Sequence, residues 1–430
     1  MIFTTTCSKD FKAEFEELLG RGKMDIATVS SIVGGIIDEI KQDKNEALFR
    51  HISKFDGWTP KCDEDLKIST DDMKKAYENL DEKLKSALHV AYDRIKNYHE
   101  KQKPKSWFDT ESNGTILGQK VTAVDSAGLY IPGGKAAYPS SLLMNVIPAQ
   151  VAGVENIVVC TPTPDNEPNE LLLGACHLCG VSEVFKVGGA SAIASMAYGT
   201  QNIPKVDVIT GPGNIFVATA KKMVFGDVHI DMIAGPSEIG VLADDSANPS
   251  HLAIDLLSQA EHDEMASSIL ITPSQKLADE VKVEISNWLE KLPRKEIAQK
   301  SIDDRGAIIV TKDMDEAVKL MNEIAPEHLE VATLSPFDLL PSIKHAGAIF
   351  LGHNTPEAIG DYVAGPNHTL PTGGTAKFYS PLGVENFMKK SSIISFSKQA
   401  INEIGEDCAL IANTEGLTAH EQSVRVRLDK

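Results

Sequence analysis

The spacing of hydrophobic positions changes along the chain near residue 115. Before that point, apolar residues recur every three or four positions in residues 26–49 and again in 71–98, which predicts amphipathic helices. Beyond it, short apolar runs rich in β-branched residues alternate with helical stretches, a pattern typical of βαβ units with a parallel sheet. We therefore predict a helical scaffold that leads into an α/β region.

Ten short apolar runs are predicted strands, and they form two groups of five. The first group is 128–131, 156–160, 183–187, 206–210 and 229–233; the second is 239–243, 268–272, 307–311, 329–333 and 347–351. A similar order of elements in both groups indicates two related α/β units, although their sequences do not repeat. The predicted fold class is α/β, with two related parallel-sheet units of an incomplete Rossmann type and with helical N-terminal and C-terminal segments.

The same pattern suggests where the domains begin and end. Residues 1–24 are expected to form an N-terminal helical tail, and 381–430 a C-terminal tail. Residues 25–127 and 237–380 are assigned to a first α/β domain, and 128–236 to a second one, which carries a glycine-rich edge.

Composition and charge narrow the class of protein. A hydrophobic content of 42% and a charged content of 24% are typical of a globular domain. The formal net charge of −19 argues against nucleic acid as a partner. No apolar run approaches the roughly 20 residues that cross a bilayer, the N-terminus has no secretory or transit pattern, and the six cysteines are scattered. We expect a cytoplasmic protein with no membrane partner.

Glycines follow four of the first five predicted strands. They occur in Pro132-Gly133-Gly134, Gly188-Gly189, Gly211-Pro212-Gly213 and Gly235-Pro236. In open parallel sheets, ligands bind at the carboxyl ends of the strands, where glycine lets the backbone approach a phosphate. One such turn could simply serve a tight bend, whereas four on one edge favour a nucleotide or a phosphorylated ligand. The G-x-G-x-x-G pattern of the ordinary Rossmann grip is not completed, because the stretch that starts at Gly211 has Phe216 in its sixth position.

A predicted helix in residues 249–262 carries two candidate metal ligands. Asn248 suits its N-cap, and Gln259 and His262 lie three positions apart, so that they share one face. A carboxamide oxygen and an imidazole nitrogen both bind divalent metals, but a catalytic zinc site has about three protein ligands or more. This helix alone therefore predicts no metal site.

Three further polar stretches follow the second group of strands. Glu327 stands beside His328 just before a strand, and Asp361 lies in a long loop rich in glycine and proline at 359–374. Glu415 and His420 lie near the start of a final short helix. Each residue alone has a structural explanation, such as a cap or a solvated side chain.

In combination, these motifs resemble those of the histidinol dehydrogenase family, from about residue 25 to the end. The resemblance is carried by Leu129-Tyr130-Ile131-Pro132-Gly133-Gly134, Gly211-Pro212-Gly213-Asn214, Ile230-Asp231-Met232-Ile233-Ala234-Gly235-Pro236-Ser237-Glu238, Ser258-Gln259-Ala260-Glu261-His262, Pro326-Glu327-His328-Leu329, and Asp361-Tyr362 through Asn367-His368-Thr369-Leu370-Pro371-Thr372. It implies a fold similar to that of aldehyde dehydrogenases. It also implies a homodimer in which the C-terminal segment makes dimer contacts and reaches the partner's site.

The resemblance also implies roles for individual residues. By this resemblance the zinc ligands are Gln259, His262, Asp361 and His420; the substrate contacts are Ser237, Gln259, His262, His328, Asp361, Glu415 and His420; the acid–base pair is Glu327 and His328; and the cofactor contacts are Tyr130, Ser191 and Asn214. Glu415 and His420 would act in the partner's site. Ser191 departs from the family, whose members usually carry Gln at that position.

The reaction implied is the oxidation of L-histidinol to L-histidine through histidinaldehyde, with two NAD molecules used in succession. His328, near its ordinary pKa, would remove the alcohol proton, and Glu327 would help a water molecule attack the aldehyde. Zinc would position the substrate, although manganese also suits such ligands.

Other classes of protein remain open at this point. A metal-dependent hydrolase could use the same polar residues, but it would not need the glycine turns. A solute-binding protein with two α/β lobes is disfavoured by the Glu327-His328 pair and by the lack of a signal peptide. A relative that has lost its activity is disfavoured because all the acid–base and metal positions are filled.

Overall fold

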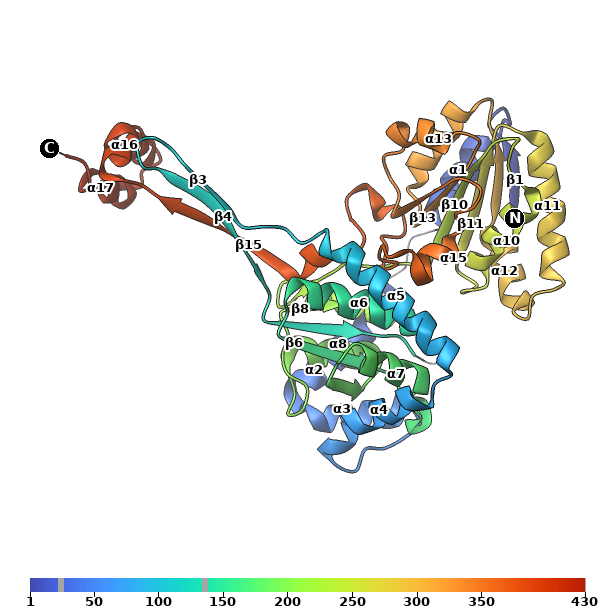
Figure 1. Ribbon diagram of the computed structural model, residues 1–430, viewed down its shortest axis with the longest axis horizontal. Coiled ribbons are helices and arrows are strands. Elements are labelled where there is room, and N and C mark those ends of the chain that lie inside the picture. The colour runs from blue at the N-terminus through green and yellow to red at the C-terminus, as the bar shows by residue number, and fades with distance from the viewer. Residues whose placement is uncertain (22–26, 134–137, 430) are drawn as a thin grey trace.

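The computed structural model describes residues 1–21, 27–133 and 138–429, which form two α/β units and a long projecting arm (Figure 1). Gly134, the last residue of the first expected glycine turn, lies outside the described residues. So does the expected border between 24 and 25.

Each unit is built around a six-stranded sheet. The β10 sheet has the order β1 (Ile2–Thr5), β12 (Ala307–Val310), β11 (Ser267–Thr272), β10 (Glu238–Ala243), β13 (His328–Ala332) and β14 (Ala348–Leu351). The β5 sheet has the order β2 (Lys67–Ile68), β7 (Glu183–Lys186), β6 (Asn156–Thr161), β5 (Ser126–Tyr130), β8 (Val208–Thr210) and β9 (His229–Ile230). Within these two sheets, all described pairings are parallel except that of β2 with β7.

The two sheets share one topology, which confirms the predicted repeat. Without the edge strands β1 and β2, each sheet runs in the order third, second, first, fourth, fifth along its own part of the chain. This is the doubly wound Rossmann order without its sixth strand. All ten predicted strands are present.

Helices cover both faces of each sheet, so that the strands are buried on both sides. On the β5 sheet, α4 (Thr70–Asn79), α5 (Glu82–Glu100), α6 (Pro139–Ala152) and α7 (Glu170–Leu178) cover one face, and α2 (Ala27–Asp43), α3 (Asn45–Phe55), α8 (Gly189–Tyr198) and α9 (Ile215–Val224) the other. On the β10 sheet, α10 (Pro249–Ala260), α11 (Gln275–Leu289) and α12 (Lys295–Arg305) cover one face, and α1 (Phe11–Gly20) and α13 (Met314–Ile324) the other. The short helices α14 (Pro336–Leu339) and α15 (Glu357–Ile359) follow β13 and β14.

The structure groups the N-terminal residues differently from the sequence-based expectation. Helices α2 to α5 pack in the β5 unit, where α2 contacts α8 and α9, and α4 contacts α7. The pattern of the sequence instead predicts that residues 25–127 join 237–380. The first residues also contribute more than a helical tail, because β1 pairs with β12 at the edge of the β10 sheet. Helical periodicity identifies an apolar face but not the sheet that the face covers.

A three-stranded antiparallel sheet forms the arm (Figure 1). Its central strand β4 (Ile116–Ala123) pairs with β3 (Trp107–Thr110) and, along its whole length, with β15 (Met388–Ser395). The arm ends in α16 (Lys398–Thr414) and α17 (Thr418–Arg425). The expected C-terminal tail is therefore an ordered ribbon and helix pair. Among the described residues, no helix has both the length and the apolar character needed to cross a membrane.

Candidate functional site

The polar residues of the unit that contains the β10 sheet meet at the amino edge of that sheet. Glu238 begins β10 and His328 begins the neighbouring strand β13, where His328 pairs in register with Ile239. The backbone N–H of Glu238 donates a 2.9 Å hydrogen bond to Oε2 of Glu327. Parallel sheets usually bind ligands at the opposite, carboxyl edge. The general rule therefore predicts the carboxyl edge of the β10 sheet, whereas this site lies at the amino edge.

His328 is buried among carboxylates. Its Nε2 lies 3.3 Å from Oδ1 of Asp361, and its Nδ1 lies 3.8 Å from carboxylate oxygens of both Glu327 and Glu357. Burial by itself lowers the pKa of His328, but the carboxylates, Glu357 first, outweigh burial and raise this pKa well above its ordinary value. The expectation of an imidazole near its ordinary pKa is thus wrong, because the carboxylates stabilise the imidazolium form.

Three buried carboxyl groups share this site, and burial raises the pKa of each although the charge of His328 opposes the shift. Burial raises the pKa of Glu327 to about 7. Burial, and then the nearby Glu327 carboxylate, raises the pKa of Glu238 to about 8. The pKa of Glu357 is raised to about 8, again chiefly by burial. A group whose pKa lies near the working pH can both take up and release a proton readily. The arrangement is that of a buried acid–base cluster.

The site also contains donors that suit a divalent cation. Ligand atoms of His328, Glu357 and Asp361 all lie within 4.8 Å of one another. Apart from its 3.3 Å contact with Oδ1 of Asp361, the buried Nε2 of His328 has no partner of good hydrogen-bond geometry among the described residues, and a buried polar atom in a native protein normally has one. Imidazole and carboxylate donors together are the ligands that zinc and similar ions prefer. The residues present therefore fit a metal ion.

Two of the expected metal ligands join this cluster from α10 and the turn after it. Gln259 is fully buried; its side-chain NH2 donates to the Glu357 carboxylate, and its oxygen accepts a 2.9 Å hydrogen bond from the N–H of Glu238. Burial lowers the pKa of His262, and the negative charge of Asp361 only partly offsets this. A neutral imidazole is the form that binds metal. The structure thus brings Gln259, His262 and Asp361 together.

The remaining expected substrate contacts divide into two groups. Ser237 joins the cluster, where its side chain is close enough to Glu327 to lower the pKa of that carboxyl. Glu415 and His420 do not join it within one chain: they are exposed residues at the end of α16 and in α17, at the tip of the arm (Figure 1). Any part they play at such a site requires the arm of a second copy.

Several members of the cluster are not predicted from the sequence alone. Glu357 precedes Asp361 by four positions, in α15 and the π-helical turn that continues it (Gly360–Ala364). Residues four apart share a helix face, so this pair of carboxylates was the available signal. Glu238 and His368 stood in the quoted motifs, but no spacing singled them out. His368 is close enough to Asp361 for the two charges to interact.

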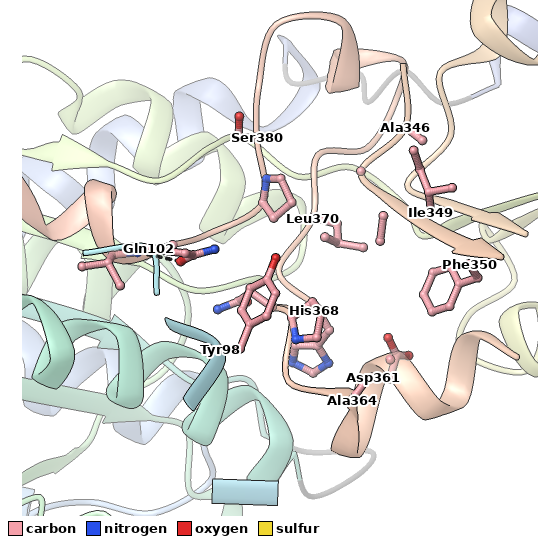
Figure 2. Close-up of a pocket in the computed structure, with 18 of the residues that line it drawn as sticks. Tyr98, Gln102, Ala346, Ile349, Phe350, Asp361, Ala364, His368, Leu370 and Ser380 are labelled. Atoms are coloured by element: carbon pink, nitrogen blue, oxygen red, sulfur yellow. Dashed lines mark hydrogen bonds between the residues drawn. The ribbon is translucent and has the colours of Figure 1, made fainter. Parts of the chain in front are cut away.

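A cavity of about 970 Å³ opens beside the cluster, between the two units. Figure 2 shows Tyr98, in the last turn of α5, and Gln102, just after that helix, on one wall and Phe350 of β14 on the other. Asp361 and His368 also line the space. Its volume suits a small organic molecule. Because residues of both units line it, a ligand bound there would contact both.

The expected cofactor contacts lie at the carboxyl edge of the β5 sheet. Tyr130 ends β5, and its hydroxyl accepts a 3.2 Å hydrogen bond from the N–H of Gly189. Asn214 caps α9, where its side-chain oxygen accepts from two backbone N–H groups of the first turn. Ser191, by contrast, is only 4% exposed, and its Oγ lies 2.9 Å from Nδ1 of His51. The Ser191 hydroxyl is therefore already paired within the protein.

The start of α8 offers an open approach to a phosphate. Gly189 has φ +60°, and within the described part of the chain no atom lies within 4 Å of the place where its Cβ would be. The first backbone N–H groups of a helix have no partner inside the helix and attract anions. This turn therefore fits the phosphates of a dinucleotide.

A short connection joins the carboxyl edge of the β5 sheet to the amino edge of the β10 sheet. β9 ends at Ile230, at the carboxyl edge of the β5 sheet, and β10 begins at Glu238, at the amino edge of the β10 sheet. Seven residues, 231–237, lie between them, so the two edges are less than about 30 Å apart along the chain even if it is fully extended. The topology thus places the glycine turns near the acid–base cluster.

Comparison with known proteins gives one consistent result. The family model described as histidinol dehydrogenase matches residues 19–428. The histidinol dehydrogenase of Sulfurimonas denitrificans is 82% identical over 430 residues, covering 100% of both chains, and that of Wolinella succinogenes is 68% identical, covering 97% of each. The crystal structure of histidinol dehydrogenase from Elizabethkingia anophelis matches with a TM-score of 0.94 at 35% identity, covering 99% of this chain and 98% of that one.

Proposed function

Because the chain belongs to the histidinol dehydrogenase family, a family of oxidoreductases, we propose that it oxidises L-histidinol to L-histidine through histidinaldehyde, in histidine biosynthesis. Two NAD molecules would be reduced in succession. The observation that carries the proposal is the buried Glu327–His328 pair, which lies among metal-binding donors and a short connection away from an edge suited to a dinucleotide. We also propose a cytoplasmic location, which suits six cysteines that are all free thiols.

The proton transfers are assigned to the Glu327–His328 pair as a unit. The two side chains lie 3.8 Å apart, and Glu327, with a pKa of about 7, is able to accept a proton near neutral pH. His328, held in its charged form by the carboxylates, donates hydrogen bonds to oxygen and passes protons on. In the second oxidation, Glu327 would take the proton of the attacking water. Burial of both groups keeps bulk water away from the aldehyde.

Gln259, His262 and Asp361, with His420 of a second copy, would hold a zinc ion. When bound, zinc would supply a positive charge that orients the imidazole and amine of the substrate. Ser237 and His328 would contact the substrate from the β10 sheet, and Glu415 from the arm of the second copy.

NAD would lie on the carboxyl edge of the β5 sheet, at the point where the strand order reverses between β5 and β8. Tyr130 and Asn214 would contact it with their side chains. Because its hydroxyl is paired with His51, Ser191 would contribute through the main chain at the start of α8. The cofactor accepts the hydride, and these residues position it.

Counting NADH tests the proposed reaction. Each histidinol molecule consumed is expected to yield two NADH, measured as absorbance against histidine formed, because both oxidations occur at one buried site. One NADH per histidinol with accumulation of the aldehyde would contradict the proposal. A cofactor-independent hydrolase is distinguished by calorimetric titration, in which such an enzyme would give no heat of NAD binding.

We further propose that the protein is a homodimer in which each arm completes the site of the other copy. The arm projects away from its own units (Figure 1), and it exposes an unusual number of large apolar side chains. These include Trp107, Phe108, Leu117, Ile394, Ile404, Leu410, Ile411 and Val426. An exposed apolar surface of this kind is typical of a subunit interface.

Co-expression of two inactive variants tests this arrangement. His262→Asn impairs the site on the β10 sheet and His420→Ala impairs the arm, so a mixed dimer would have one intact site. About a quarter of wild-type activity is then expected, because about half of the dimers are mixed. The control pairs His420→Ala with Glu415→Ala, two arm variants that cannot complement each other. Recovery in the control pair as well, or in neither pair, would contradict action in trans.

A further inference from the structure

A buried ion pair holds the glycine turn that follows β8. Lys221 in α9 contacts Asp231, the first residue after β9, and the two are only 2% and 5% exposed. Nζ of Lys221 donates a 2.9 Å hydrogen bond to the carbonyl oxygen of Gly211, and Oδ2 of Asp231 accepts a 2.9 Å hydrogen bond from the N–H of the same glycine. Both backbone polar groups of Gly211 are thus bound by the two members of one ion pair.

The position of Gly211 matters because it lies against the main chain of Tyr130. Its φ is +115°, and a Cβ at this position would lie 2.0 Å from the carbonyl oxygen of Tyr130. The turn ends at Asn214, the exposed N-cap of α9. The ion pair therefore sets how Asn214 is placed relative to Tyr130, on the two sides of the point where the strand order reverses.

Asp231 also connects this turn to the acid–base cluster. Its Oδ1 accepts a 2.6 Å hydrogen bond from the N–H of Met232, at the start of the connection that leads to Ser237 and Glu238. One carboxylate thus binds both the glycine turn at the β5 edge and the first bend of the segment that enters the β10 sheet.

We propose that Lys221 and Asp231 are positioning residues for the dinucleotide. They hold the Gly211–Asn214 turn in the shape that lets Tyr130 and Asn214 contact NAD together; this rests on the NAD site of the proposed function. The pair carries no net charge and so does not act by attracting phosphate. Apolar residues of similar size often stabilise a fold as well as a buried ion pair does. Apolar residues cannot bind the N–H and the C=O of Gly211, however. These two groups need one acceptor and one donor, which Asp231 and Lys221 supply.

The test is the double variant Lys221→Met/Asp231→Leu, compared with wild type as the full-length, metal-loaded enzyme. We expect it to fold with a similar Tm and to bind NAD at least about tenfold more weakly by calorimetric titration. The kcat at saturating NAD should change less than about threefold, because neither substituted residue is a member of the acid–base cluster. The control is Ile68→Ala, in the core of the same unit, which should lower Tm but leave the Kd for NAD unchanged.

The outcomes separate this inference from the proposed function. Wild-type protein that binds no NAD would overturn both. Wild-type protein that binds NAD, with a folded double variant of equal affinity, would overturn the positioning role alone. If the double variant does not fold, Lys221→Met/Asp231→Asn decides: it keeps an acceptor for the N–H of Gly211, removes the donor to its carbonyl oxygen and leaves no unpaired buried charge. A severalfold weaker affinity is then expected, and an unchanged Kd for NAD overturns the role.

Discussion

The His328→Asn variant is expected to lose about 1000-fold in kcat for histidinol oxidation, within the range usual for removal of an acid–base group. The KM for NAD should stay nearly constant, because the glycine turns lie on the other sheet. The loss arises because Asn cannot carry the proton that the surrounding carboxylates hold on His328. Steady-state rates with histidinol and with histidinaldehyde measure the effect on each half of the reaction.

Leu329→Val is the matched control for this variant. Leu329 follows His328 in β13 and is fully buried on the apolar side of the strand. Loss of one methylene there should lower the free energy of unfolding by about 1 kcal/mol while kcat is unchanged. If His328→Asn retained more than about a tenth of wild-type kcat, His328 would not take part in proton transfer.

Removal of the divalent cation is expected to reduce histidinol oxidation about 1000-fold or more, because substrate positioning depends on it. A chelator and the His262→Asn variant should have the same effect. In the variant, metal content measured by elemental analysis should fall in parallel with activity. NAD binding should persist in both cases, since Tyr130 and Asn214 belong to the other unit.

The matched control is His251→Asn, which removes an exposed imidazole from α10, the helix that leads to His262. This control should keep both its metal and its activity. Stoichiometric metal in His262→Asn would show that His262 is not a ligand. The alternative donors are then His328, Glu357 and Asp361, whose ligand atoms already lie within 4.8 Å of one another.

The sequence alone determined the elements and much of the chemistry. Strands of a doubly covered parallel sheet are buried on both faces, so each appears as an apolar run, and all ten were predicted from such runs. Glycine turns and the Glu327-His328 pair are also local features. The chemistry that these residues can perform therefore follows from their types and spacing, without knowledge of the residues that pack against them.

The tertiary structure alone decided how these elements meet. Which sheet α2 to α5 cover, the pairing of β4 with β15, and the convergence of Glu238 and Glu357 on His328 all join residues far apart in the chain. The hydrogen bonds of Lys221 and Asp231 to Gly211 likewise join separate parts of the chain. Local periodicity reports only that a face is apolar or that a residue is polar. The partner of each is selected by packing of the whole chain, which here also places the chemistry at the amino edge of the β10 sheet.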